Sequence, residues 1–240
     1  MSEWSSYRLQ DFIPFTSDIY FRLLERMGEA YWPLHLLILA LGASAFFLSL
    51  RGRARIACFL LAPVWGFVGV AYFFARYGEL NWAGNYMGWA FLAQAATLTL
   101  FSITHFGTEV SPQRRGLPFF AGVLIAATGL LGYPVIAPLM GYSWFQAETF
   151  GIHPAPTAVT TLGLVVISLR GAAMWIAAAI PLLWITVSGL TLVVLDAPWA
   201  SAPFAILALG LAGLVWAEME RRSDRAKARQ APDKRGLPNS

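Results

Sequence analysis

The sequence predicts an all-α protein, a polytopic transmembrane helical bundle of about seven spans. Two observations carry this prediction. Of the 240 residues, 58% are hydrophobic and only 12% are charged, whereas an ordinary soluble domain has about a quarter charged residues. Apolar runs near the roughly 20 residues that a helix needs to cross a bilayer recur along nearly the whole chain. No stretch is therefore left for a separate soluble domain.

Seven apolar segments are expected to form the membrane domain, residues 32–217. Their approximate limits are 32–50, 56–75, 85–106, 117–140, 157–169, 172–195 and 199–217. The fourth contains Pro134 and Pro138, which remove backbone donors and predict a kinked outer end. The fifth is so short that its helix would rise about 20 Å, roughly two thirds of the hydrocarbon thickness. We therefore expect a short or half-buried helix there.

Polar segments flank the predicted spans. In residues 1–31, a helix lying at the membrane interface is expected to begin near Ser17 and Asp18. Its apolar face would consist of Ile19, Tyr20, Leu23, Leu24 and Met27. Residues 218–240 form a basic segment, because seven of the seventeen Lys and Arg residues lie in the last twenty positions. We expect this tail to be cytoplasmic and disordered.

The distribution of Arg residues predicts the orientation. The loops after the first, third and fifth segments carry Arg51, Arg53, Arg55, Arg114, Arg115 and Arg170. The loops on the other side hold Glu79, Glu148 and Asp196, with Arg76 at one boundary. Because Lys and Arg accumulate on the cytoplasmic side, the N-terminus is expected outside and the C-terminus inside a bacterial inner membrane. The basic charge thus reports topology, and no nucleic-acid partner is predicted.

A proline-rich break at the outer end is the first candidate functional feature. Pro154 and Pro156 precede Thr157, which we expect to be the N-cap of the short fifth helix. Free amides and the helix dipole at that point would favour an anionic group, as in transporters with broken helices. The alternative is a proline-rich loop followed by a short tilted helix.

Glu148 and His153 form the second feature, because a neighbouring acid and imidazole can pass protons or hold a cation. His35 is also expected near the outer face, so a haem or metal shared by His35 and His153 is an alternative. The chain has no haem motif and one cysteine, Cys58, in an apolar run. These residues therefore predict no metal site, and they do not identify a cofactor.

Asn81, Asn85 and Trp82, together with Trp144, form the third feature at the same outer face. Amides at membrane depth need hydrogen-bond partners, either on neighbouring helices or on a ligand. An aromatic belt at the membrane surface would account for the tryptophans without any ligand. These four residues complete the candidate ligand-binding set of Glu148, His153 and Thr157.

Three groups of residues carry a resemblance to a known family. They are Asn81-Trp82; Gln146-Ala147-Glu148, Phe150-Gly151, Pro154, Pro156-Thr157-Ala158 and Thr161-Leu162-Gly163; and Pro181-Leu182-Leu183-Trp184 with Ser188-Gly189. From Tyr7 to about residue 215 the chain resembles an uncharacterised bacterial multi-pass inner-membrane family, a domain of unknown function. The resemblance implies the helical membrane fold and implies no activity. It also implies an acidic residue between the two prolines, where this chain has Ala155.

The leading functional hypothesis is a protein that binds or transports a small solute through a pocket open to the periplasmic side. The polar residues on one side and the broken helix favour it. A non-enzymatic accessory or scaffold subunit of a larger membrane complex is the alternative, with other membrane subunits or a second copy as partners. A membrane-embedded enzyme ranks third, because the familiar catalytic motifs are missing from the sequence.

Overall fold

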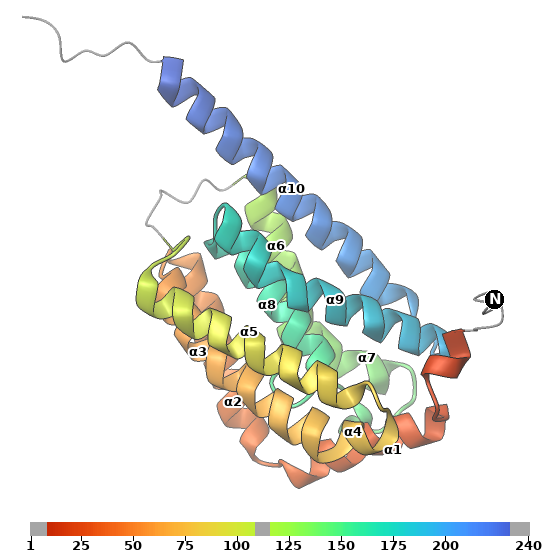
Figure 1. Cartoon of the computed structure of the whole chain (residues 1–240). Helices are drawn as coiled ribbons and strands as arrows, with labels where there is room; N and C mark the ends of the chain where they lie inside the picture. The colour runs from red at the N-terminus through yellow and green to blue at the C-terminus, as the bar shows by residue number, and fades with distance from the viewer. Residues whose placement is uncertain (1–8, 109–115, 231–240) are drawn as a thin grey trace, which may run out of the picture.

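The computed structural model describes residues 9–108 and 116–230, and these residues form helices without a β-sheet (Figure 1). The α-helices are α1 (Ser17–Ala30), α2 (Leu34–Leu50), α3 (Ala54–Val68), α4 (Gly78–Leu80), α5 (Gly84–Thr104), α6 (Leu117–Ala127), α7 (Tyr133–Leu139), α8 (Pro154–Ser168), α9 (Ala172–Val194) and α10 (Ser201–Gln230). Short 3-10 helices are η2 (Leu9–Phe12) and η5 (Trp144–Gln146). Two π-helical stretches are η3 (Gly69–Tyr77) and η4 (Thr128–Gly132). The predicted all-α fold is confirmed.

Five helical stretches among the described residues are long and apolar enough to cross a membrane. They are Ala54–Leu80, Gly84–Thr104, Leu117–Leu139, Ala172–Val194 and Ser201–Lys227. Helices α1 and α2 give a sixth candidate if they are taken together, although the chain bends by 91° between them. The remaining predicted segment is α8, a shorter apolar helix. The number of spans and their orientation remain predictions.

Helix α8 lies at the centre of the bundle. Its residues from Pro154 to Ile167 are all buried, and it contacts α2, α3, α6, α9 and α10. A helix that is apolar on all sides belongs in a core. Because protein surrounds it, α8 does not need the length of a lipid-facing span. The helix begins at Pro154 rather than at Thr157, since proline suits the first turn of a helix.

Glycines allow α6 and η4 to approach α8 at backbone distance. A Cβ atom on Gly163 would lie 2.4 Å from the nitrogen of Ala126 and 2.5 Å from the carbonyl oxygen of Gly122. A Cβ atom on Gly129 would lie 2.5 Å from the nitrogen of Thr160. Small residues at such crossings bring two helix backbones together. This crossing therefore holds α8 against the helices that lead to the loop between α7 and α8.

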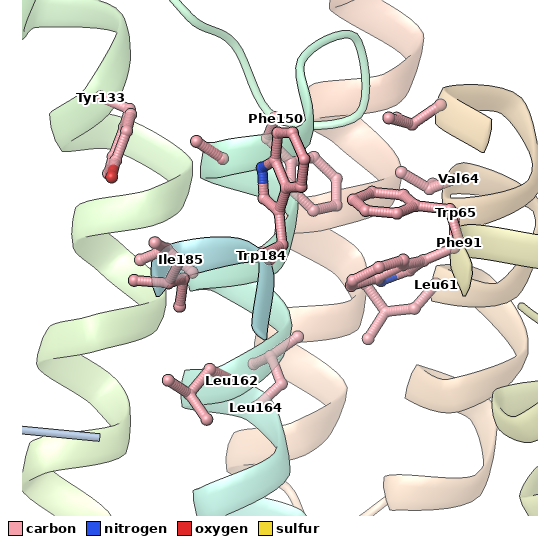
Figure 2. Packing of buried hydrophobic residues seen from close by; sticks show 14 of the residues in the cluster. Leu61, Val64, Trp65, Phe91, Tyr133, Phe150, Leu162, Leu164, Trp184 and Ile185 are labelled. Carbon is pink, nitrogen blue, oxygen red and sulfur yellow. The ribbon is translucent and has the colours of Figure 1, made fainter. Parts of the chain in front are cut away.

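Large aromatic side chains fill the core on the other side of α8 (Figure 2). The rings of Trp65 and Phe91 have centroids 4.4 Å apart, and Phe91 packs edge-on against Trp184 at 5.8 Å. The indole nitrogen of Trp65 donates a hydrogen bond of 2.8 Å to the hydroxyl of Thr161. That bond satisfies two buried polar groups at once. It links α3 directly to α8.

Helix α1 covers the end of the bundle that the sequence predicts to face outward, which we call the outer end. It begins at Ser17 as predicted and buries Tyr20, Phe21, Leu23, Leu24, Met27 and Gly28, whereas Ile19 is 44% exposed. The Phe21 ring packs against Tyr142 and Trp199, at centroid distances of 4.8 and 5.7 Å. The bend of 91° sets α1 across the end of α2. The apolar face thus packs on the protein's own outer loop.

Residues 218–230 correct the expectation of a disordered tail that begins at residue 218. Helix α10 continues without a break to Gln230 (Figure 1). Glu218 accepts hydrogen bonds from Arg221 and Arg222, one turn away. Such pairs of opposite charge stabilise a helix surface. The part of the predicted tail after residue 230 lies outside the described residues.

The Arg-bearing loops meet at one end of the bundle, which permits a direct test of orientation. Arg55 donates to the carbonyl oxygen of Ser102 at 2.6 Å, and Gly107 lies against Arg170 and Ala173. If that end is cytoplasmic, a cysteine at exposed Ser143 should react with an impermeant maleimide added to intact cells. A cysteine at exposed Ser223 should react only after the membrane is opened. Labelling of Ser223→Cys alone in intact cells would reverse the orientation.

Candidate functional site

The loop between α7 and α8, residues 140–153, folds back onto the start of α8. Gly151 has a φ of +75°, a conformation that favours glycine. Its N–H donates a hydrogen bond of 2.8 Å to the hydroxyl of Thr157. That hydroxyl in turn donates to the carbonyl oxygen of His153 at 2.7 Å. Thr157 is fully buried, so it holds the loop in place from inside the first turn of α8.

The start of α8 offers little to an anion. A helix normally leaves four amide donors without partners at its N-terminus. His153 precedes the first helical residue, and its N–H is already bonded to the carbonyl oxygen of Thr149 at 3.0 Å. Pro154 and Pro156 have no N–H at all. Ala155 is the only residue before Thr157 in this turn with an N–H, so this helix end has few donors for an anion.

Glu148 is the buried acid of this loop. Its side chain is 7% exposed, and the hydroxyl of Tyr20 in α1 donates to its Oε1 atom at 3.4 Å. Burial raises the pKa of the Glu148 carboxyl from its ordinary 4.5 to about 7, and the hydrogen bond from Tyr20 opposes that shift. The carboxyl therefore changes charge near neutral pH.

Two further tyrosines lie within electrostatic range of the same carboxyl. Glu148 interacts electrostatically with the hydroxyls of Tyr72 and Tyr133. Both hydroxyls are buried and have no hydrogen-bond partner among the described residues. Buried polar groups are nearly always hydrogen-bonded, so two buried hydroxyls without such a partner, both interacting with one buried acid, need an explanation. We call Tyr20, Tyr72, Tyr133, Glu148 and His153 the outer cluster.

The two π-helical stretches place these tyrosines. Tyr72 lies within η3, and Tyr133 directly follows η4. A π-turn adds a residue to one turn of a helix and so rotates every residue that follows it, and such turns occur often at functional sites. The apolar patterns of these two segments give no sign of the shift in phase.

His153 is neutral in this buried environment at neutral pH. Its Nδ1 accepts a hydrogen bond of 3.0 Å from the N–H of Thr149, which places the ring proton on Nε2. That nitrogen donates to the carbonyl oxygen of Leu24 in α1 at 3.3 Å. Burial lowers the pKa of His153 to about 4. The imidazole therefore ties α1 to the loop and adds no positive charge near Glu148 at neutral pH.

The remaining candidates lie outside the outer cluster. Asn81 is buried, but its amide nitrogen donates to the carbonyl oxygen of Phe12 at 3.0 Å and its oxygen accepts from Ala83 at 2.9 Å. Trp82 and Trp144 are 66% and 69% exposed, and Asn85 is also exposed. The structure thus brings Glu148, His153 and Thr157 together and leaves these four apart.

His35 lies at the start of α2, close enough to His153 for an electrostatic interaction. Its Nδ1 atom is buried and has no hydrogen-bond partner among the described residues. Within the same part of the chain, His, Cys, Asp and Glu side chains form no group of three that could hold a metal ion.

The described residues form an all-helical bundle with five helices suited to crossing a membrane and a buried polar cluster at one end. The chain belongs to the family of unknown function DUF6064, which matches residues 17–228. No curated protein and no solved structure matches the chain. The family match begins with α1 and ends within the last turns of α10, so it includes the whole outer cluster.

Proposed function

We propose that this protein is an integral protein of the bacterial inner membrane that binds a small cationic solute at its outer cluster. The observation that carries the proposal is the buried carboxyl of Glu148 within electrostatic range of the hydroxyls of Tyr72 and Tyr133, which have no hydrogen-bond partner among the described residues. A solute that brings hydrogen-bonding groups would satisfy the hydroxyls, and its positive charge would compensate the carboxylate. Transport across the membrane is the further step of the same hypothesis.

The charge of the cluster favours a cation over an anion. Glu148 supplies a negative charge above neutral pH, while His153 stays neutral. The surrounding rings of Tyr20, Phe15 and Tyr77 pack together at centroid distances of about 6 Å. Aromatic faces attract organic cations through their quadrupoles. A small primary or quaternary amine therefore fits this chemistry better than a carboxylate or phosphate does.

Access to the cluster requires α1 to move. Helix α1 contributes Tyr20 and the carbonyl oxygen of Leu24 to the cluster, and so closes it from outside. A solute would therefore reach the cluster only by displacement of α1. The sharp bend between α1 and α2 gives α1 a natural hinge.

A binding assay on the purified protein in nanodiscs tests the proposal. Ethylamine, putrescine, choline and tetramethylammonium should each be screened at pH 8 by thermal shift and by tryptophan fluorescence. At least one is expected to bind to the wild type, and Glu148→Gln should weaken its binding by about tenfold or more, as loss of a charged hydrogen-bond partner does. Glu79→Gln is the matched control, because Glu79 is an exposed acid of the same outer end.

A scaffold subunit is the competing function, and the assay separates the two. A scaffold would bind none of the amines, and Glu148→Gln would leave its behaviour unchanged. It would instead purify with other membrane subunits or as a homo-oligomer. Equal binding of an amine to wild type and Glu148→Gln would place the solute elsewhere and would overturn the proposal.

A further inference from the structure

A groove of about 1560 Å³ opens at the opposite end of the bundle, among the Arg-bearing loops. It lies between the C-terminal end of α5, the start of α6, the α8–α9 turn and the last turns of α10. Drug-sized ligands occupy pockets of about 300 to 1,000 Å³, so this groove has room for something larger. The outer cluster does not contribute to it.

The walls of the groove are apolar on the membrane side. Leu100 and Phe101 line it from α5, Phe119 from α6 and Ile176 from α9. Leu100 and Ile176 are 55% and 50% exposed. An apolar wall that continues onto the lipid-facing surface suits an acyl chain, because the chain can leave the groove sideways into the bilayer.

The rim of the groove is basic. Arg170, Arg221, Arg225 and Lys227 line it, against the acids Glu220 and Asp224. Arg221 is paired with Glu218, and Glu220 interacts electrostatically with Arg170. The cations still outnumber the acids. The N-terminus of α9, which no side chain caps, adds its positive dipole end beside Arg170.

Arg170 is held in a fixed position on this rim. Its Nη1 atom donates to the carbonyl oxygens of Val166, Ile167 and Leu169, the last of these at 2.9 Å. The guanidinium thus caps the C-terminal end of α8. The Nη1 atom makes these cap bonds, and the planar guanidinium has further N–H donors for an oxyanion.

We propose that this groove holds an anionic phospholipid of the adjacent leaflet, with the phosphate near Arg170, Arg225 and Lys227 and one acyl chain along Leu100 and Ile176. Basic pockets between transmembrane helices on the cytoplasmic side are a known setting for anionic headgroups. The position of the Arg-rich loops, which predict the cytoplasmic side, agrees with it. This lipid site is independent of the solute site at the outer end.

Native mass spectrometry of the full-length protein in detergent tests the lipid site. Phosphatidylglycerol is expected to bind more tightly than phosphatidylcholine. The double variant Arg225→Gln/Lys227→Gln should weaken phosphatidylglycerol binding by roughly thirtyfold, equivalent to about 2 kcal/mol, because it removes two cations that attract the anionic headgroup. Both positions are exposed, and Gln is a good helix former, so α10 should stay folded.

Arg51→Gln/Arg53→Gln is the matched control, since it removes two exposed charges from the same end but outside the groove. It should change binding by less than about twofold. Ile176→Trp, which narrows the groove without altering charge, should also reduce lipid binding. Equal losses in both double variants, equal affinity for phosphatidylcholine, or displacement of the lipid by free glycerol phosphate would each overturn the proposal.

Discussion

Glu148→Gln should make the protein more stable at pH 8 than the wild type, by up to roughly 3 kcal/mol, because a buried carboxylate no longer has to be desolvated. The folded-state pKa of Glu148 is about 7, above its ordinary 4.5. Below pH 4.5 the carboxyl is protonated in both the folded and unfolded states, and its burial costs little. As pH rises from 4.5 to 7, the unfolded state loses the proton first. The wild type therefore loses stability across that window.

The same variant should also reveal how His153 makes the stability depend on pH. Its folded-state pKa of about 4 lies below the ordinary 6.5, so the stability present at neutral pH is lost as pH falls from 6.5 towards 4. In the wild type the two groups oppose each other between pH 4.5 and 6.5. Glu148→Gln should instead gain stability steadily from pH 4 to 6.5 and then level off.

Thermal unfolding in detergent, followed by tryptophan fluorescence from pH 4 to 9, measures both effects. Glu79→Gln, the exposed acid at the same end, should follow the wild-type profile. A wild-type profile for Glu148→Gln would mean that the carboxyl is well solvated, and would remove the basis of the outer cluster.

Gly163→Ala should destabilise the protein by about 3 kcal/mol, because overpacking of a tight core typically costs 1–3 kcal/mol or more. The added Cβ would meet backbone atoms of α6 at 2.4 and 2.5 Å. Backbone atoms cannot move aside as a flexible side chain can, so α6 and α8 would have to separate. For a chain of this size the melting temperature should fall by roughly 10 °C.

Gly66→Ala is the matched control for this crossing. Gly66 also lies within a helix, but a Cβ there would meet nothing closer than Ala95 at 4.0 Å. Alanine is favoured over glycine in helices by about 1 kcal/mol, so this variant should be as stable as the wild type or slightly more stable. Equal melting temperatures for the two variants would show that the α6–α8 contact is looser than the structure has it.

The helical segments could be predicted from the sequence because apolar runs and their breaks report local structure directly. Helix α1 begins at Ser17, where the amphipathic pattern places it, and α8 occupies the short fifth segment. The central position of α8 could not be predicted, because an apolar run looks the same whether lipid or protein surrounds it. The extent of α10 was also missed, since its charges pair along the helix instead of repelling.

The candidate site, like the fold, could be predicted from the sequence only in part. Glu148, His153 and Thr157 are near in sequence, and their proximity in space could be predicted. Tyr20, Tyr72 and Tyr133 come from three distant segments, and phenols within apolar helices resemble ordinary packing residues. The positions of Tyr72 and Tyr133 also depend on π-helical turns that carry no recognisable sequence signal. The basic groove could not be predicted, because Arg170 and the α10 cations also fit the distribution that marks the cytoplasmic side.

The pH dependence of amine binding tests the central claim most directly. If Glu148 holds the positive charge of a small amine, the affinity of the best ligand should rise about tenfold from pH 6 to pH 8, as the carboxyl ionises around pH 7. Glu148→Gln should bind weakly and equally at both pH values. An affinity that is the same at pH 6 and pH 8 in the wild type would contradict the assignment of Glu148 as the cation-binding group.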